Sequence, residues 1–179
     1  ATLLYAVLGL GTAGLRERLK GGDSGLLRYA GLLVQRPRSA HALQHCLADA
    51  FQVPVRIRQF MGAWLSVQEE DWTRLGMPGT NNLLGQTAVV GSKVWDQQAK
   101  FQVRLGPLDF ETFSRLLPSG KAFPTMIRLM KFMAGPELDF NVHLVLKAPE
   151  VPPCRLQVTP AYAPRLGWTT WLSSTPRTS

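Results

Sequence analysis

A change of hydrophobic period between residues 39 and 58 constrains the fold more than any other feature of the sequence. After Ser39, a good helix N-cap, apolar residues recur at the three- and four-residue spacing of one helix face. They are Leu43, Cys46, Leu47, Ala50 and Phe51. The period then becomes two, with Val53, Val55 and Ile57 alternating with Pro54, Arg56 and Arg58. This region therefore predicts an amphipathic helix followed directly by a half-buried strand, with Pro54 at the strand's start or at a sheet edge.

The remaining elements follow the same two periods. Residues 101–105 and 140–146 alternate as strands, and we expect short strands at 87–91 and 156–158, the latter pairing with 140–146. Helices are expected over residues 26–33, 110–117 and 123–134, with Asp109 as the N-cap of the second. Because helices and strands mix without regular βαβ alternation, the sequence predicts an α+β fold with short helices on small, mostly antiparallel sheets.

Residues 66–86 have no hydrophobic period and are rich in glycine, proline, asparagine and acidic residues, which is typical of a long exposed loop. We expect three parts along the chain: an N-terminal helical segment at 1–38, an α+β domain at 39–172 and a disordered tail at 173–179. Because the first residue is not methionine and no charged leader precedes the apolar opening, we expect residues 1–38 to continue a missing N-terminal half.

Charge and composition narrow the class of protein. The chain carries 20 Lys and Arg against 12 Asp and Glu, and 45% of its 179 residues are hydrophobic, so it can bury a core and is not expected to be disordered. Its positive charge is spread without a basic block, which favours an acidic protein partner and leaves a basic nucleic-acid-binding module as the alternative. The two cysteines do not form a C-x-x-C pair, which suits a protein of a reducing compartment. No stretch reaches the roughly 20 apolar residues that a membrane-spanning helix needs.

No set of residues predicts catalysis. Residues 9–14 match the dinucleotide pattern G-x-G-x-x-G, but no carboxylate stands about 20 residues further on, so a glycine-rich turn is the better interpretation and a dinucleotide enzyme the weaker hypothesis. His41 and His45 have metal-ligand spacing, yet they oppose the apolar face, and Ala42 stands where the zinc-protease motif has a glutamate. Cys46 is expected in the core, and Ser114 has no visible base. We therefore expect neither an enzyme nor a bound metal or cofactor.

Five tryptophans are the most informative side chains. Large aromatics in loops either hold those loops on a core or anchor a partner protein. We expect Trp95 to lie in the core. Trp64, Trp72, Trp168 and Trp171 are candidates for an interface.

Several separated blocks of the sequence resemble the TssG family, also called ImpH or VasB, a baseplate subunit of bacterial type VI secretion systems. The blocks occur in the family's order between about residues 26 and 172. They include 27–33 (LRYAGLL), 35–40 (QRPRSA), 51–57 (FQVPVRI), 91–96 (GSKVWD), 105–108 (LGPL) and 166–172 (LGWTTWL). The resemblance covers the C-terminal half of the family.

This resemblance implies a structural role. Proteins of this kind join two TssF copies into a wedge, bind TssK trimers and help to hold TssE around a spike hub, in the cytoplasm at the inner membrane. It implies no catalysis, no cofactor, no nucleic acid and no insertion into the membrane. A wedge subunit needs loops that reach its neighbours, so we expect the 66–86 loop and the proline-rich residues 149–166 to face partners. Trp64, Trp72, Tyr162, Trp168 and Trp171 are the expected partner-binding residues, unless these loops only cover sheet edges.

Overall fold

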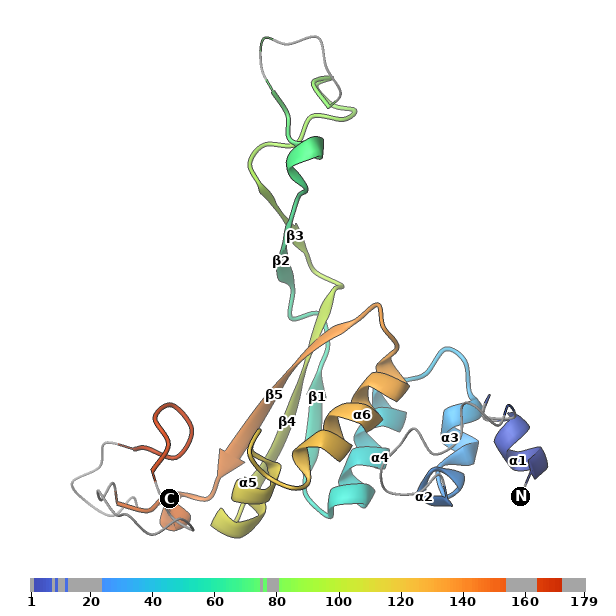
Figure 1. Cartoon of the computed structure of the whole chain (residues 1–179), viewed down its shortest axis with the longest axis vertical. Coiled ribbons are helices and arrows are strands. Elements are labelled where there is room, and N and C mark those ends of the chain that lie inside the picture. Colours follow the sequence, from blue (N-terminus) through green and yellow to red (C-terminus); the bar gives the residue numbers. More distant parts are fainter. Residues whose placement is uncertain are drawn as a thin grey trace.

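The computed structural model describes residues 2–7, 9, 12, 24–74, 76, 81–153 and 164–171. Its helices are α1 (Thr2–Val7), α2 (Ser24–Leu27), α3 (Ala30–Val34), α4 (Ala40–Phe51), α5 (Phe110–Leu116) and α6 (Phe123–Ala134), with 3-10 turns η2 (Glu69–Asp71) and η3 (Ala148–Glu150). Its strands are β1 (Val55–Arg58), β2 (Ala63–Ser66), β3 (Lys93–Asp96), β4 (Lys100–Leu108) and β5 (Asp139–Leu146). Figure 1 shows two parts: a body of helices on a sheet, and a narrow arm, residues 59–99, that projects from it.

The body is built on a three-stranded sheet in the order β1-β4-β5. β1 and β4 are antiparallel, whereas β4 and β5 are parallel because α5 and α6 carry the chain back before β5 begins. The predicted α+β class with short helices on small, mostly antiparallel sheets is confirmed, with this one parallel pair added. Strand β4 changes register between Leu105 and Leu108. There Gly106 has φ +125°, and a Cβ would lie 2.3 Å from the Val145 carbonyl oxygen, so only glycine fits.

The core lies where α4 and α6 pack side by side against the sheet (Figure 1). The predicted helix after Ser39 is confirmed: the Ser39 hydroxyl accepts a hydrogen bond from the Ala42 amide at 3.1 Å. Its apolar face buries Leu43, Cys46 and Leu47, although Ala50, in the last turn, is exposed. The largest side chains that are almost fully buried come from α4, β4, α5 and α6: Leu47, Leu105, Leu108, Leu116, Met126 and Met130.

Two of the local predictions were wrong. The helix expected over 26–33 is broken into α2 and α3, because the two residues between them turn toward α4. There the Arg28 guanidinium lies 2.9 Å from the Asp49 carboxylate, and the Tyr29 hydroxyl donates to the same carboxylate at 2.5 Å. Residues 87–91, expected as a strand, are turn and coil, and the strand begins only at β3. The strand expected at 156–158 lies outside the described residues.

The arm extends the chain far from the core. Within the described chain, no buried hydrophobic residue belongs to it. Strands β2 and β3 pair antiparallel, and the Val67 amide continues the ladder by donating to the Ser92 carbonyl at 2.9 Å. At the root, the Met61 amide donates to the Lys100 carbonyl at 3.0 Å, which ties the arm to the start of β4. No described helix, in the body or elsewhere, is long and apolar enough to cross a membrane.

Candidate partner-binding surface

A cross-strand aromatic pair stabilises the lower part of the arm. Trp64 on β2 lies directly opposite Trp95 on β3, with ring centroids 5.4 Å apart in an edge-to-face arrangement. The Trp95 ring covers Gly62, where φ is +65° and an added Cβ would lie 2.0 Å from the indole. Such cross-strand pairs contribute roughly 0.2–1 kcal/mol, which matters in a ribbon that has no core.

The tip of the arm is held by hydrogen bonds. The Trp72 indole nitrogen donates to the Val67 carbonyl at 3.0 Å and closes the turn around η2. The Thr73 hydroxyl donates to the Asn81 carbonyl at 2.8 Å and accepts from the Val89 amide at 2.9 Å, so one side chain joins the two sides of the tip. Because these bonds satisfy backbone groups, they fix the fold of the tip without covering its apolar side chains.

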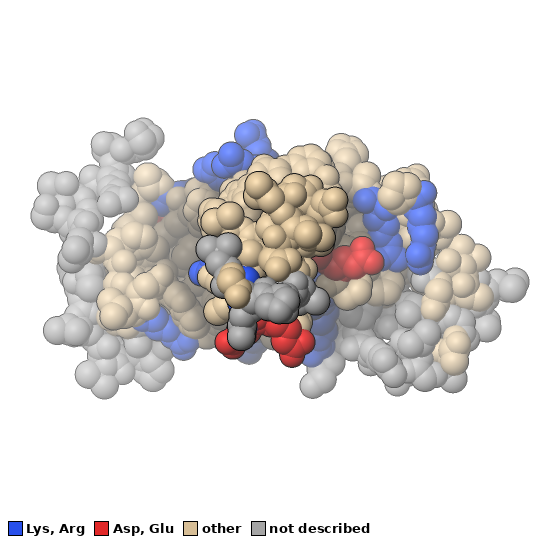
Figure 2. Space-filling model, turned by 90° about the horizontal axis from the view of Figure 1, so that it is seen from above, with Lys and Arg blue, Asp and Glu red and all other residues tan. Residues whose placement is uncertain are grey.

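Exposed apolar residues gather on the arm. Of the fourteen large hydrophobic residues exposed in the described chain, nine belong to it: Phe60, Trp64, Leu65, Trp72, Leu83, Leu84, Val90, Val94 and Trp95. Leu84 is 95% exposed and Val90 97%, so these side chains contact almost nothing. In Figure 2 uncharged residues dominate the centre, where the arm points at the viewer, and charged side chains lie around it. Exposed apolar residues gathered in this way are typical of protein-interaction sites.

The predicted interface residues fall into two groups. Trp64 and Trp72 lie on the arm, where they are 64% and 39% exposed. Trp168 lies in the turn at residues 166–169 and Trp171 lies just after it, both near α5. Trp171 is half-buried against Phe113, with ring centroids 5.9 Å apart, whereas Trp168 is 42% exposed. Tyr162 lies outside the described residues. The structure thus places the first two candidates on the arm and the next two on the body.

Trp95 was predicted in the core, and that was wrong. It is 47% exposed and packs only with its neighbours on the arm, because β3 pairs with β2 and not with the sheet of the body. Sequence reasoning also missed Leu84 and Val90. A signal for both existed in the sequence: large aliphatic residues inside a segment of glycine and polar residues have no periodic partner to bury them.

The other candidate sites give no catalytic arrangement in the described part of the chain. The segment before Gly9 is helix α1, whereas a dinucleotide fold needs a strand there, and most of the glycine-rich motif lies outside the described residues. Cys46 is buried, and burial, with the Asp49 charge, raises the pKa of its thiol to about 11. His41 and His45 are exposed, with 2.9 Å between their Nε2 atoms. No described group of three or more His, Cys, Asp or Glu could hold a metal ion.

Chains with the same fold occur in solved structures of multi-protein complexes. A chain in the type VI secretion system TssK-TssF-TssG baseplate subcomplex matches with a TM-score of 0.75 and 21% identity, over 99% of this chain and 72% of that one. A chain in another structure, the baseplate complex from the type VI secretion system, matches with a TM-score of 0.64 and 20% identity, over 98% of this chain and 50% of that one. No curated protein sequence matches. The model of the type VI secretion family TssG matches residues 1–173, and the chain therefore belongs to the TssG family.

Proposed function

We propose that this protein is a structural subunit of the type VI secretion baseplate wedge, and that the arm is its main contact with partner proteins. In this role it joins two copies of TssF to TssK trimers, helps to hold TssE around the spike hub, and acts in the cytoplasm at the inner membrane without turning over a substrate. Membership of the TssG family and the likeness to a chain in a TssK-TssF-TssG baseplate subcomplex support the role.

One observation carries the assignment of the arm. A folded segment with nine exposed large hydrophobic residues and no buried hydrophobic residue among its described residues is costly to keep in water. Its backbone pairing in β2 and β3 and its tip hydrogen bonds give it a definite shape. A shaped apolar surface can bind a partner without paying the full ordering cost of a disordered segment.

Within the arm, Trp64 and Trp72 are the proposed anchors. Tryptophan is enriched among residues that dominate binding free energy, because it buries a large area and loses few rotamers. The Trp72 indole nitrogen is already bonded to the Val67 carbonyl, so its ring is oriented before a partner arrives. Trp168, Trp171 and Tyr162 remain predicted partner contacts of the C-terminal region.

The first experiment is co-expression of the full-length protein with TssF and TssK from the same genome, followed by affinity purification, size-exclusion chromatography and mass spectrometry. We expect one stable particle that contains all three chains. A monomer bound only to nucleic acid, with an affinity that falls steeply with salt concentration, would instead support the basic nucleic-acid-binding alternative.

Variants of the arm test its part in this complex. Leu84→Ser with Val90→Ser, and separately Trp72→Ala, should reduce recovery of the complex at least tenfold while the melting temperature stays within about two degrees. Leu84 and Val90 are almost fully exposed, and Trp72 holds only the tip of the arm, which is separate from the core of the body. Val34→Ser is the matched control, since Val34 is an exposed aliphatic residue of the body. Equal recovery from all variants would contradict the role of the arm.

A further inference from the structure

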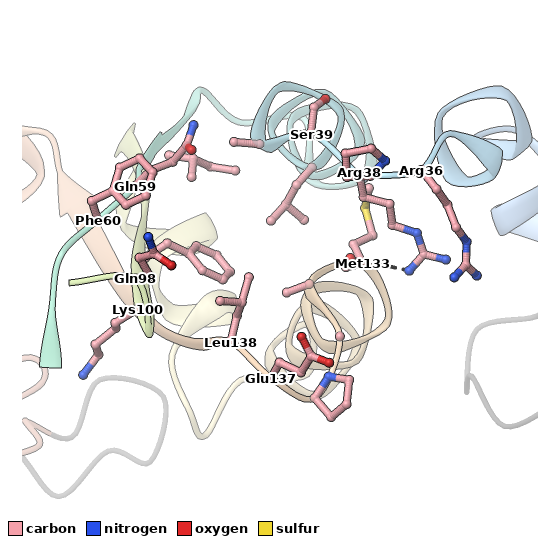
Figure 3. A pocket seen from close by; sticks show the side chains of 18 residues that line it. Arg36, Arg38, Ser39, Gln59, Phe60, Gln98, Lys100, Met133, Glu137 and Leu138 are labelled. Atoms are coloured by element: carbon pink, nitrogen blue, oxygen red, sulfur yellow. Dashed lines mark hydrogen bonds between the residues drawn. The ribbon is translucent and has the colours of Figure 1, made fainter. Parts of the chain in front are cut away.

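The body has a pocket of about 580 Å³ at the root of the arm. It opens between the start of α4, the end of β1, the start of β4 and the end of α6 (Figure 3). Its apolar lining comes from distant parts of the sequence. Leu43, Phe101 and Met133 are buried core residues that form the floor, and Phe60 and Leu138 are exposed at its edge.

The charges around this pocket are unbalanced. Arg36, Arg38 and Lys100 line it together with one acid, Glu137. In Figure 3 the Arg36 and Arg38 side chains extend in the same direction at one end, and Lys100 projects at the opposite end. The two ion pairs of the described chain, Arg28 with Asp49 and Arg74 with Glu69, use none of these cations.

Arg38 is held in place by carbonyl groups. Its guanidinium donates to the Phe132 and Met133 carbonyls at the end of α6, and it stacks over the Phe132 ring at 5.0 Å. Partial burial and the nearby Arg36 guanidinium lower the pKa of Arg38. The Arg38 Nε also donates to the Leu33 carbonyl at 3.4 Å, so the bonds to carbonyl groups hold its Nε and Nη1. Glu137 also lines the pocket, but neither described ion pair joins a carboxylate to Arg36 or Arg38, so this end of the pocket favours an anion. The fork geometry of the Arg36 guanidinium suits a carboxylate.

The edge of the pocket at Phe60 is held in an unusual backbone conformation. Phe60 has φ +57°, a left-handed conformation that a bulky residue rarely adopts. It is kept there by the Gln97 side-chain amide, which donates to the Phe60 carbonyl at 2.6 Å. Gln97 in turn accepts a hydrogen bond from the Trp95 indole nitrogen at 2.9 Å. The arm's aromatic pair therefore fixes the residue that flanks the pocket.

We infer that this pocket binds an extended segment of a neighbouring baseplate protein in which a carboxylate lies close to a large apolar side chain. The apolar side chain enters between Phe60 and Leu138 onto the floor formed by Leu43, Phe101 and Met133, and the carboxylate binds between Arg36 and Arg38. The inference rests on the proposed baseplate role, since it takes the partner from that complex, but it uses a surface separate from the tip of the arm.

Site-specific photo-cross-linking in the co-expressed full-length complex tests this. The photoreactive amino acid p-benzoylphenylalanine replaces Gln98, an exposed residue that lines the pocket, or Glu111, an exposed residue of α5 that does not. We expect Gln98 to cross-link to a TssF or TssK peptide that has Asp or Glu within about three residues of a large apolar residue, and Glu111 not to capture that peptide.

Charge reversals make the test quantitative. Arg36→Glu with Lys100→Glu should lower the Gln98 cross-link yield at least tenfold. Arg56→Glu with Arg104→Glu is the matched control, because these two residues are exposed, face each other across β1 and β4, and change the net charge equally outside the pocket. Its yield should change less than twofold. Arg36→Glu alone repeats the test with a single exposed residue if the double variant loses its far-UV circular dichroism.

The failures are distinguishable. If no complex forms with TssF or TssK, both the baseplate role and the pocket inference fail. If the complex forms but Gln98 cross-links only within its own chain, to nucleic acid or to a peptide without carboxylates, the pocket inference alone is overturned. Equal loss of yield in the two charge-reversal variants would show a general effect of net charge and would also overturn it.

Discussion

The body and the arm are stabilised by different forces, although they belong to one chain. In the body, side chains from α4, α5, α6 and the sheet bury one another, so the hydrophobic effect holds the fold together. In the arm, paired backbone groups and side-chain hydrogen bonds define the shape, and the large apolar side chains stay in water. The difference indicates that the body folds around a core of its own, whereas the apolar side chains of the arm are available to a partner.

The largest expected difference between the body and the arm is the loss of unfolding free energy when a leucine is replaced by alanine in each. Leu47 is fully buried in α4, so Leu47→Ala should lower the free energy of unfolding by about 2–5 kcal/mol through lost burial and a cavity. Leu84→Ala, on the arm, should change it by less than about 0.5 kcal/mol. Urea unfolding followed by far-UV circular dichroism measures both. Similar losses would mean that the arm has a core of its own and would remove the distinction.

A second prediction concerns the local order of the arm. Gly62→Ala forces alanine into the left-handed region, at a cost of about 1–2 kcal/mol, and also drives its methyl group into the Trp95 ring. Gly91→Ala is the control, because Gly91 has φ +94° with no atom within 4 Å of an added Cβ. We expect only Gly62→Ala to abolish the near-UV circular dichroism of the tryptophan pair. Unfolding of the body, followed in the far-UV, should keep its midpoint in both.

Much of the body could be predicted from helix N-caps and from the alternation of apolar residues along the strands. Ser39 and Asp109 were recognised as N-caps, and both accept the expected amide hydrogen bond, from Ala42 and Thr112 respectively. The alternation over residues 101–105 also places Phe101, Val103 and Leu105 in the core, as expected. These features depend on neighbours within a few residues, so a single sequence contains the necessary signal.

The arm and the pocket could not be predicted in this way. The pairing of Trp64 with Trp95 joins segments separated by a long stretch of polar and glycine residues, and no local period marks β2, because its residues are mostly exposed. The pocket joins Arg36, Phe60, Lys100 and Leu138, which come together only after the sheet and both long helices have packed. The parallel pairing of β5 with β4 depends likewise on the crossover through α5 and α6.

Loss of the Ser39 N-cap of α4, in the body, should have a smaller effect on the free energy of unfolding. Ser39→Ala removes the hydroxyl that accepts from the Ala42 amide and should lower the free energy of unfolding by about 1 kcal/mol. Ser39→Asp, which keeps an acceptor at the N-cap, should restore most of it. Denaturant unfolding of the three proteins checks this, and an unchanged midpoint for Ser39→Ala would mean that packing alone fixes the start of α4.

The last prediction concerns the body and the pH dependence of its free energy of unfolding. It involves the Tyr29 hydroxyl and the Cys46 thiol, both near Asp49, and its effect at neutral pH is the smallest of all. Burial, the hydrogen bond to Asp49 and the charge of Asp49 raise the pKa of Tyr29 from 10.0 to about 12. Burial raises that of Cys46 from 9.0 to about 11. Both groups therefore keep their protons in the folded protein at a pH where the unfolded chain has lost them. Because the folded state then binds more protons, the free energy of unfolding should fall as the pH rises from about 9 to about 12.

Tyr29→Phe should remove the part of this fall between pH 10 and 12 and leave the part due to Cys46, as measured by urea unfolding across that range. An identical slope in Tyr29→Phe would show that the Tyr29 hydroxyl is not held by Asp49 in solution, and that the break between α2 and α3 needs another cause.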